Sequence, residues 1–84
     1  MTYKLIFTEK FTKKLDSITK KDRERILKKI DLLKENPFLG KRLVNSYFFK
    51  LRIGKYRVIY DVRGNLLEIF LLEVALRKKV YKNI

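Results

Sequence analysis

The sequence predicts an α+β fold with the order β-α-α-β-β-β, in which an N-terminal helical hairpin packs on one face of a small antiparallel sheet. Three observations lead to this fold class. Apolar residues recur at helical spacing between residues 9 and 35. They alternate with polar residues between 47 and 62, and a further apolar run follows at 66–74. The length of 84 residues suits one domain, spanning 1–84, with a single modest core.

The first half of the chain predicts one strand followed by two helices. Residues 3–7 are rich in strand-forming types, and Thr8 is a helix N-cap before a first helix over 9–17. Thr19 begins a second helix after so short a connection that the two must pack antiparallel. This helix ends at Asn36-Pro37, because the residue before a proline disfavours helical backbone. The apolar stripes consist of Phe11, Leu15, Ile18, Ile26, Leu27, Ile30 and Leu33.

Residues 47–62 predict a β-hairpin that turns at Gly54-Lys55. The expected cross-strand pairs are Ile53/Tyr56, Leu51/Val58, Arg52/Arg57 and Lys50/Ile59. The first two pairs lie on one face and the last two on the other, because side chains alternate along a strand. One face of the hairpin is therefore core, and the other is cationic.

A third strand over 66–74 is expected to pair with the second arm of the hairpin after a turn at Arg63-Gly64-Asn65. It is apolar on both faces, which is typical of an interior strand. The expected pairs are Val62/Leu67, Tyr60/Ile69, Asp61/Glu68, Ile59/Phe70 and Arg57/Leu72. This register gives the cationic face no acidic neighbour near Arg57, and Asp61/Glu68 is interpreted as a solvated edge contact rather than a metal site.

Composition excludes several classes of function. The chain has no cysteine and no histidine, so disulfides, thiolate metal sites and histidine acid–base chemistry are all absent. No apolar run is long enough to span a membrane, no signal peptide is recognisable, and the expected location is the cytoplasm. The net charge is +13, and two stretches without any acidic residue, 36–60 and 74–84, carry ten of the basic residues. A polyanionic partner follows: nucleic acid first, an acidic protein segment second, a membrane surface third.

The cationic face of the hairpin needs an explanation. Like charges directly opposite each other in a sheet destabilise it by up to about 1 kcal/mol. The pair Arg52/Arg57 beside Lys50 is therefore unfavourable unless a carboxylate or a bound anion offsets it. Charge alone leaves two readings equally open, a solvated basic face and an anion-binding site.

Three segments resemble the RelE/ParE toxin superfamily. They are the helix end at Asn36-Pro37, the hairpin from Phe49-Lys50-Leu51-Arg52 to Tyr56-Arg57-Val58-Ile59-Tyr60, and the ending Arg77-Lys78-Lys79-Val80-Tyr81. The resemblance implies a type II toxin held inactive by an acidic, RelB-like antitoxin. In this superfamily the RelE branch cleaves mRNA in the ribosomal A site, whereas the ParE branch inhibits DNA gyrase.

The resemblance also implies a catalytic set without metal or other cofactor: Lys50, Arg57, Arg77 and Tyr81. Further residues expected to bind RNA are Lys41, Arg42, Phe48, Arg52, Lys55, Lys78 and Lys79. Two positions depart from the family pattern, because Phe48 replaces a second lysine and Leu76 replaces a frequent histidine. The loss of that lysine puts the rate of cleavage in question.

The function expected from these residues is metal-independent cleavage of ribosome-bound mRNA, with the antitoxin, the ribosome and mRNA as partners and no membrane contact. The retained lysine, arginines and tyrosine favour this hypothesis over two alternatives. One alternative is a ParE-like gyrase inhibitor that is not an enzyme. The other is a decayed toxin that only binds its antitoxin.

Overall fold

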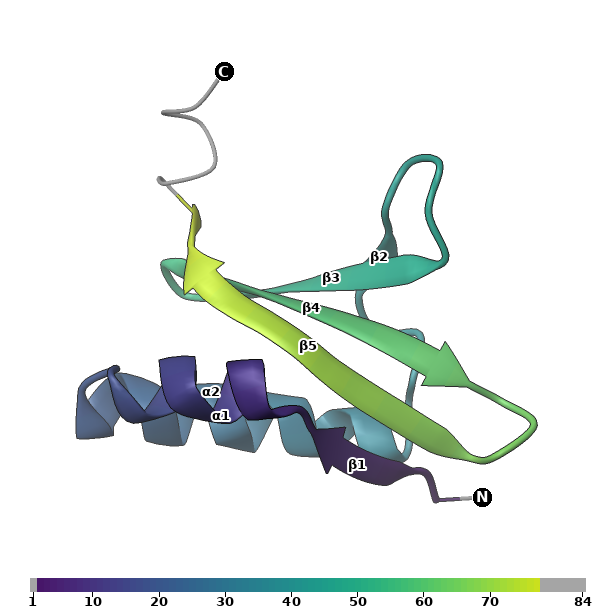
Figure 1. Cartoon of the computed structure of the whole chain (residues 1–84), viewed down its shortest axis with the longest axis horizontal. Coiled ribbons are helices and arrows are strands. Elements are labelled where there is room, and N and C mark those ends of the chain that lie inside the picture. Colours follow the sequence, from purple (N-terminus) through teal and green to yellow (C-terminus); the bar gives the residue numbers. More distant parts are fainter. Residues whose placement is uncertain (1, 78–84) are drawn as a thin grey trace.

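The structure is a computed structural model that describes residues 2–77 (Figure 1). Its elements, in order, are β1 (Lys4–Phe7), α1 (Glu9–Asp16), α2 (Lys20–Asp31), a 3₁₀ turn η1 (Leu32–Lys34), β2 (Lys41–Arg42), β3 (Phe48–Ile53), β4 (Tyr56–Arg63) and β5 (Glu68–Leu76). The predicted α+β class and the predicted order of elements are confirmed. The short strand β2 is an addition that the sequence did not predict.

The five strands form one sheet in the order β1-β5-β4-β3-β2. β5 lies in the interior of this sheet, as its two apolar faces predicted. β1 runs parallel to β5, with Lys4 opposite Glu68 and Phe7 opposite Leu71, while all other pairs are antiparallel. The sheet is therefore mixed rather than wholly antiparallel. The parallel pair arises because β1 leads through two helices and a hairpin before the chain returns as β5.

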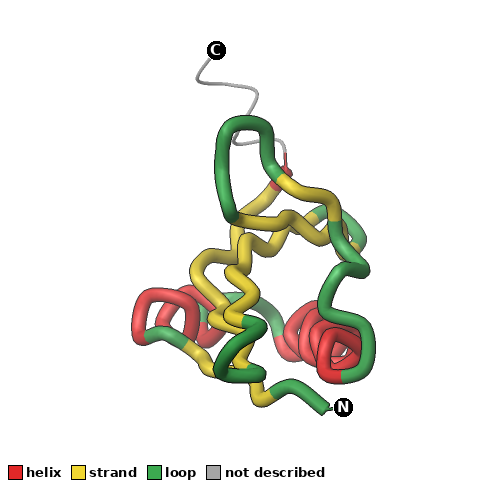
Figure 2. The backbone as a smooth tube through the Cα atoms, turned by 90° about the vertical axis from the view of Figure 1, so that its right-hand side faces the viewer, coloured by secondary structure: helices red, strands yellow, loops and turns green. Residues whose placement is uncertain are grey.

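Both helices begin where their capping residues predicted. The Oγ1 atoms of Thr8 and Thr19 accept hydrogen bonds from the backbone N–H groups of Phe11 (3.3 Å) and Asp22 (3.5 Å). The helices run antiparallel in Figure 1, and Figure 2 shows them end-on as two separate coils. α1 packs against β5 and α2 against β3. No helix within residues 2–77 is long and apolar enough to cross a lipid bilayer.

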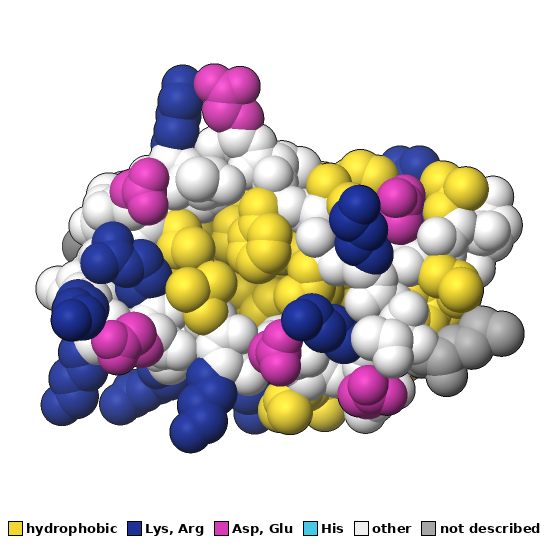
Figure 3. Space-filling model, turned by 90° about the horizontal axis from the view of Figure 1, so that it is seen from below, with side chains coloured by type: hydrophobic (Ala, Val, Ile, Leu, Met, Phe, Trp, Pro, Cys, Tyr) yellow, Lys and Arg dark blue, Asp and Glu magenta, His cyan; other side chains and the backbone are white. Residues whose placement is uncertain are grey.

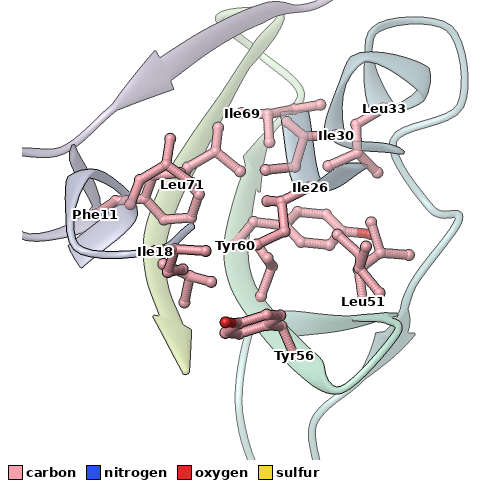
Figure 4. Packing of buried hydrophobic residues seen from close by; sticks show 14 residues of the cluster. Phe11, Ile18, Ile26, Ile30, Leu33, Leu51, Tyr56, Tyr60, Ile69 and Leu71 are labelled. Carbon is pink, nitrogen blue, oxygen red and sulfur yellow. The ribbon is translucent and has the colours of Figure 1, made fainter. Parts of the chain in front are cut away.

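The core lies between the two helices and one face of the sheet (Figure 4). Phe11, Ile26 and Ile30 of the helices and Val58 and Tyr60 of the sheet are completely buried. The remaining members are Leu15, Ile18, Leu33, Leu51, Ile53, Tyr56, Ile69, Leu71 and Val74. All apolar stripe residues predicted on the helices belong to it except Leu27.

Leu27 is exposed because it faces a groove between α2 and β1 instead of the sheet. Tyr3, Leu5 and Phe7 line the same groove. Figure 3, which views the molecule from below, shows hydrophobic side chains gathered on this face among charged ones.

The register of the β3–β4 hairpin is the predicted one at every expected pair. The predicted β4–β5 register is wrong. Tyr60 lies opposite Leu71, Asp61 opposite Phe70, and a bulge between Ile59 and Tyr60 shifts the remainder by one further residue. The cause is a four-residue turn over 64–67, where the prediction had a two-residue turn. Leu67 in this turn has a left-handed conformation (φ 53°).

The predicted contact between Asp61 and Glu68 is consequently absent from the described sheet. Asp61 is buried, and its Oδ2 accepts a 2.6 Å hydrogen bond from Nε of Arg63 on the same strand. This ion pair explains how a carboxylate is accommodated within the sheet.

Candidate functional site

The candidate site is the outer face of the sheet, defined as the face of β2, β3 and β4 that points away from the helices and carries Lys41, Lys50, Arg52 and Arg57. Two pairs of like charge face each other there: Lys41 opposite Lys50, and Arg52 opposite Arg57. Such pairs are unfavourable in a sheet without an anion. The hairpin prediction identified the second pair; the first exists because β2 pairs with β3.

Arg57 is a half-buried basic residue of the outer face. Its side chain is 22% exposed, and its Nη2 lies 3.8 Å from Oε1 of Glu73 on β5. The Nε–H of Arg57 is buried and has no hydrogen-bond partner within residues 2–77. A buried donor without an acceptor is unfavourable by about 1–3 kcal/mol. Arg57 therefore has one donor that no described residue uses.

Glu73 corrects the expectation that no acidic residue adjoins the basic face. It lies opposite Ile59 and diagonal to Arg57, because the bulge in β4–β5 shifts it to that position. Its other oxygen, Oε2, pairs with Nζ of Lys10 on α1 at 3.1 Å. The Glu73 carboxylate thus forms ion pairs with two cations, Lys10 and Arg57. Lys50 and Arg52 have no ion pair among the described residues.

The loop before β2 is held against the sheet by Tyr60. The Tyr60 hydroxyl donates to the carbonyl of Pro37 and accepts from the N–H of Gly40, both at 2.9 Å. Burial raises the pKa of this hydroxyl, and the Gly40 N–H opposes the rise. Gly40 passes so close to β3 that a Cβ there would collide with the carbonyl oxygen of Lys50. This contact positions Lys41 beside Lys50.

Arg77 lies at the β3–β4 turn. Its N–H donates to the carbonyl of Lys55 (2.9 Å), and its Nη1 donates to the carbonyl of Gly54 (3.2 Å). Gly54 directly follows β3 and is four residues from Lys50, roughly 13 Å of extended chain. The structure therefore brings Lys50 and Arg57 together and places Arg77 at the end of the same hairpin. Lys78, Lys79 and Tyr81 lie outside the described residues.

The other residues predicted to bind RNA surround this face. Arg42 stacks over the ring of Tyr47 (5.7 Å), and its Nε donates to the carbonyl of Ser46. Phe48 is 40% exposed and lies opposite Asp61 on the outer face. Lys55 is 3.8 Å from Asp22 at the start of α2.

The β2–β3 connection carries residues that the sequence did not single out. Figure 1 shows this loop standing out from the sheet. Val44 and Tyr47 are 87% and 80% exposed on it, the most exposed large apolar side chains of the described chain. An exposed aromatic ring beside an arginine is suited to stacking on a nucleobase. Tyr47 belongs to the first arm of the predicted hairpin, whereas in the structure β3 begins at Phe48 and Tyr47 lies in the connection before it.

A family model described as ParE toxin of type II toxin–antitoxin system, parDE, matches residues 5–81. The chain belongs to this family. A comparison with curated protein sequences found no significant match.

Solved structures of RelE toxins share the fold. The archaeal RelE–RelB complex from Pyrococcus horikoshii is 28% identical, with a TM-score of 0.81, covering 92% of the toxin and 97% of that chain. A mutant Escherichia coli RelE in complex with an antitoxin RelBc peptide is 26% identical, with a TM-score of 0.82 and coverage of 99% and 94%. The Mycobacterium tuberculosis RelBE2 complex, at 22% identity, covers 92% and 100% with a TM-score of 0.82 and supports the fold alone.

Proposed function

We propose that the toxin is a RelE-type endoribonuclease that cleaves mRNA in the ribosomal A site without a metal ion. The observation that carries this proposal is the outer-face cluster of Lys41, Lys50, Arg52 and Arg57, in which two like-charge pairs face each other and Arg57 retains an unused buried donor. A phosphate group bound there would relieve the repulsion and accept hydrogen bonds from the Arg57 guanidinium.

The reaction requires three functions around one phosphate. A base takes the proton of the ribose 2′-OH, and the 2′-oxygen forms a bond to phosphorus. Charge on the phosphorane is stabilised, and the bond from phosphorus to the 5′-oxygen breaks as that oxygen receives a proton. The products are a 2′,3′-cyclic phosphate and a 5′-hydroxyl.

We assign these functions by position and chemistry. Arg57 binds the phosphate, since its guanidinium forms paired hydrogen bonds with oxyanions. Lys50, diagonal to Arg57 on the neighbouring strand, is one candidate base, and Tyr81 is the other. Arg77 stabilises the phosphorane or protonates the leaving oxygen, which requires it to release the Gly54 carbonyl and move along the hairpin.

The ribosome supplies the orientation that so weak an acid–base set lacks. Fixing the 2′-OH in line with the scissile bond can contribute several kcal/mol. Free RNA is accordingly a poor substrate in this proposal. Cytoplasmic location follows from a ribosomal target. The resting toxin is held by an acidic antitoxin, a proposal supported by the RelB chains bound to RelE in the P. horikoshii and E. coli complexes.

A gyrase inhibitor is the second candidate, and the family model supports it because that model describes ParE toxins. In that case the outer face would bind a partner without catalysing any reaction. The retention of Lys50, Arg57, Arg77 and Tyr81 supports the nuclease, since an inhibitor has no evident need for this set.

The deciding experiment is toeprinting of mRNA on programmed ribosomes with wild-type toxin, Arg77→Ala and Tyr81→Phe. The proposal expects cleavage in the A site by wild type, and losses on the order of 10²–10³ in rate for a variant that lacks one stabilising group. A gyrase supercoiling assay runs in parallel. If mRNA stays intact and supercoiling is inhibited, the ParE-like function replaces the nuclease. If mRNA stays intact and gyrase remains active, antitoxin binding is the only function left.

A further inference from the structure

A basic groove runs along the edge of the sheet between α2 and β3 and adjoins the outer face, with which it shares Lys41, Lys50 and Arg52. Two adjoining pockets of about 410 Å³ and 310 Å³ form it, and they share Lys29 of α2 and Arg52 of β3. The basic residues that line the groove are Arg25, Lys28, Lys29, Lys41, Lys50 and Arg52. No acidic side chain lines either pocket, and none of the six forms an ion pair within residues 2–77.

The groove exists because β2 is short. β2 covers β3 only at Phe49 and Lys50, so the edge of β3 from Leu51 to Ile53 is open to α2. Leu32, Leu39, Leu51 and Ile53 form its apolar floor. Arg25 closes the far end, since its Nη1 would lie 3.2 Å from a Cβ placed on Gly54 of the β3–β4 turn.

The charges repeat at regular intervals along both walls. Arg25 and Lys29 are one helical turn apart, about 6 Å along α2. Lys50 and Arg52 are two residues apart on β3, about 6.6 Å. These spacings are close to that between adjacent phosphates of one nucleic-acid strand, and the apolar floor between the walls suits ribose and base surfaces.

We infer that the α2–β3 groove binds the sugar–phosphate backbone of single-stranded RNA adjoining the outer face. Lys41, Lys50 and Arg52 belong to both surfaces, so one strand can pass from the outer face around the edge of β3 toward Gly54. This inference rests on the proposed function for the identity of the ligand. It adds three residues of α2, Arg25, Lys28 and Lys29, that the sequence analysis did not assign to RNA.

RNA accounts for the groove better than an acidic peptide does. The groove meets the outer face at Lys50, beside the proposed phosphate site at Arg57, so the strand that is cleaved would itself continue into the groove. The two rows of cations with an apolar floor match a strand that has charges along its length and apolar surface beside them.

The test measures binding without cleavage. A fluorescein-labelled single-stranded RNA oligomer is titrated with wild-type toxin, with Arg25→Gln/Lys29→Gln, and with the matched control Lys4→Gln/Lys14→Gln. The control removes the same charge from exposed positions on β1 and α1. Fluorescence anisotropy is recorded between about 50 and 200 mM salt, and thermal melting confirms that all three proteins are folded.

Each phosphate contact contributes about 0.7 to the slope of log K against log salt for single strands, so the groove variant is expected to lose about 1.4 from the slope and to bind more weakly. The control should keep the wild-type slope. Equal losses in both variants would overturn the inference, because they would show a response to net charge alone. The same variant is also titrated with an oligoglutamate peptide. If loss of Arg25 and Lys29 weakens binding of this peptide as much as it weakens binding of RNA, the RNA assignment is overturned.

The two proposals fail in different ways. Reduced RNA binding by the groove variant in a toxin that leaves ribosomal mRNA intact would support the groove and contradict the nuclease. Cleavage by a toxin whose groove variant binds RNA like wild type would support the nuclease and contradict the groove.

Discussion

Glu73 lies diagonally across from Arg57 on the outer face, with its Oε1 3.8 Å from Nη2 of the guanidinium. The same carboxylate binds Lys10 of α1 at 3.1 Å. Arg57 thus has a counter-ion inside the toxin while its Nε remains without a partner in the described chain. An RNA phosphate at Arg57 has to compete with Glu73 for the guanidinium.

Removing the Glu73 charge should therefore strengthen RNA binding. We expect Glu73→Gln to bind the RNA oligomer more tightly than wild type, because repulsion of the phosphate is removed and Arg57 is released. The loss of the exposed Lys10 pair should lower stability by no more than about 1 kcal/mol. Glu9→Gln on α1 is the control, since it removes an equal charge far from the outer face. An equal gain in both variants would mean that net charge, not the contact with Arg57, limits binding.

Arg57→Gln should lose most of the ribosome-dependent cleavage while retaining the fold. The removal of one stabilising donor typically lowers the rate by about 10²–10³, and toeprinting rates measure this loss. Arg57→Lys should recover only part of the rate, because an ammonium group lacks the planar fork that binds two phosphate oxygens. Arg23→Gln on α2 is the control at an arginine outside the groove and the outer face. Normal cleavage by Arg57→Gln would remove Arg57 from the mechanism.

The β3–β4 hairpin was predictable because each step depends on local chemistry. Gly54 adopts a positive φ (59°) in a two-residue turn, and this turn fixes every pair down to Lys50 and Ile59. Sequence reasoning therefore placed Lys50, Arg52 and Arg57 on one face correctly. The N-caps at Thr8 and Thr19 succeeded for the same reason.

The parts that failed depend on contacts between distant segments. Leu66 and Leu67 look like strand residues, but they belong to a turn whose Leu67 carbonyl accepts from the N–H of Lys4 in β1. The bulge that brings Glu73 toward Arg57 has no signature in the apolar pattern of β5. β2 is only two basic residues long, so nothing in its pattern indicates that it faces β3.

Tyr60→Phe should make the pH dependence of stability shallower at alkaline pH. Desolvation raises the pKa of the Tyr60 hydroxyl above its ordinary value of 10.0. The native toxin holds this proton more tightly than the unfolded chain does. The resulting contribution of Tyr60 to the free energy of unfolding is therefore complete below about pH 10, and it is lost as pH rises through the pKa of the folded state. Near neutral pH the variant should be less stable by about 1–3 kcal/mol, because the Gly40 N–H and the Pro37 carbonyl lose their partner.

Urea unfolding of wild type and Tyr60→Phe at about pH 8 and about pH 11 measures the difference. The gap in unfolding free energy between the two proteins should narrow at the higher pH. Tyr47→Phe, at an exposed tyrosine, should show no such gap at either pH. A gap that is the same at both pH values would show that Tyr60 does not titrate differently in the native and unfolded states.

Gly40→Ala should impair both stability and RNA binding. A methyl group at this position would collide with the backbone carbonyl of Lys50 and lie 2.8 Å from the Tyr60 hydroxyl, neither of which can move freely. We expect a loss of about 1–3 kcal/mol from overpacking, which lowers the melting temperature by about 4–8 °C per kcal/mol for a domain of this size. RNA affinity should fall as well, because the shift separates Lys41 from Lys50. Gly64→Ala is the matched control, since a methyl group there meets only the Tyr3 hydroxyl at an ordinary 3.9 Å. If Gly40→Ala melts like Gly64→Ala and binds RNA like wild type, the close approach to Lys50 does not position Lys41.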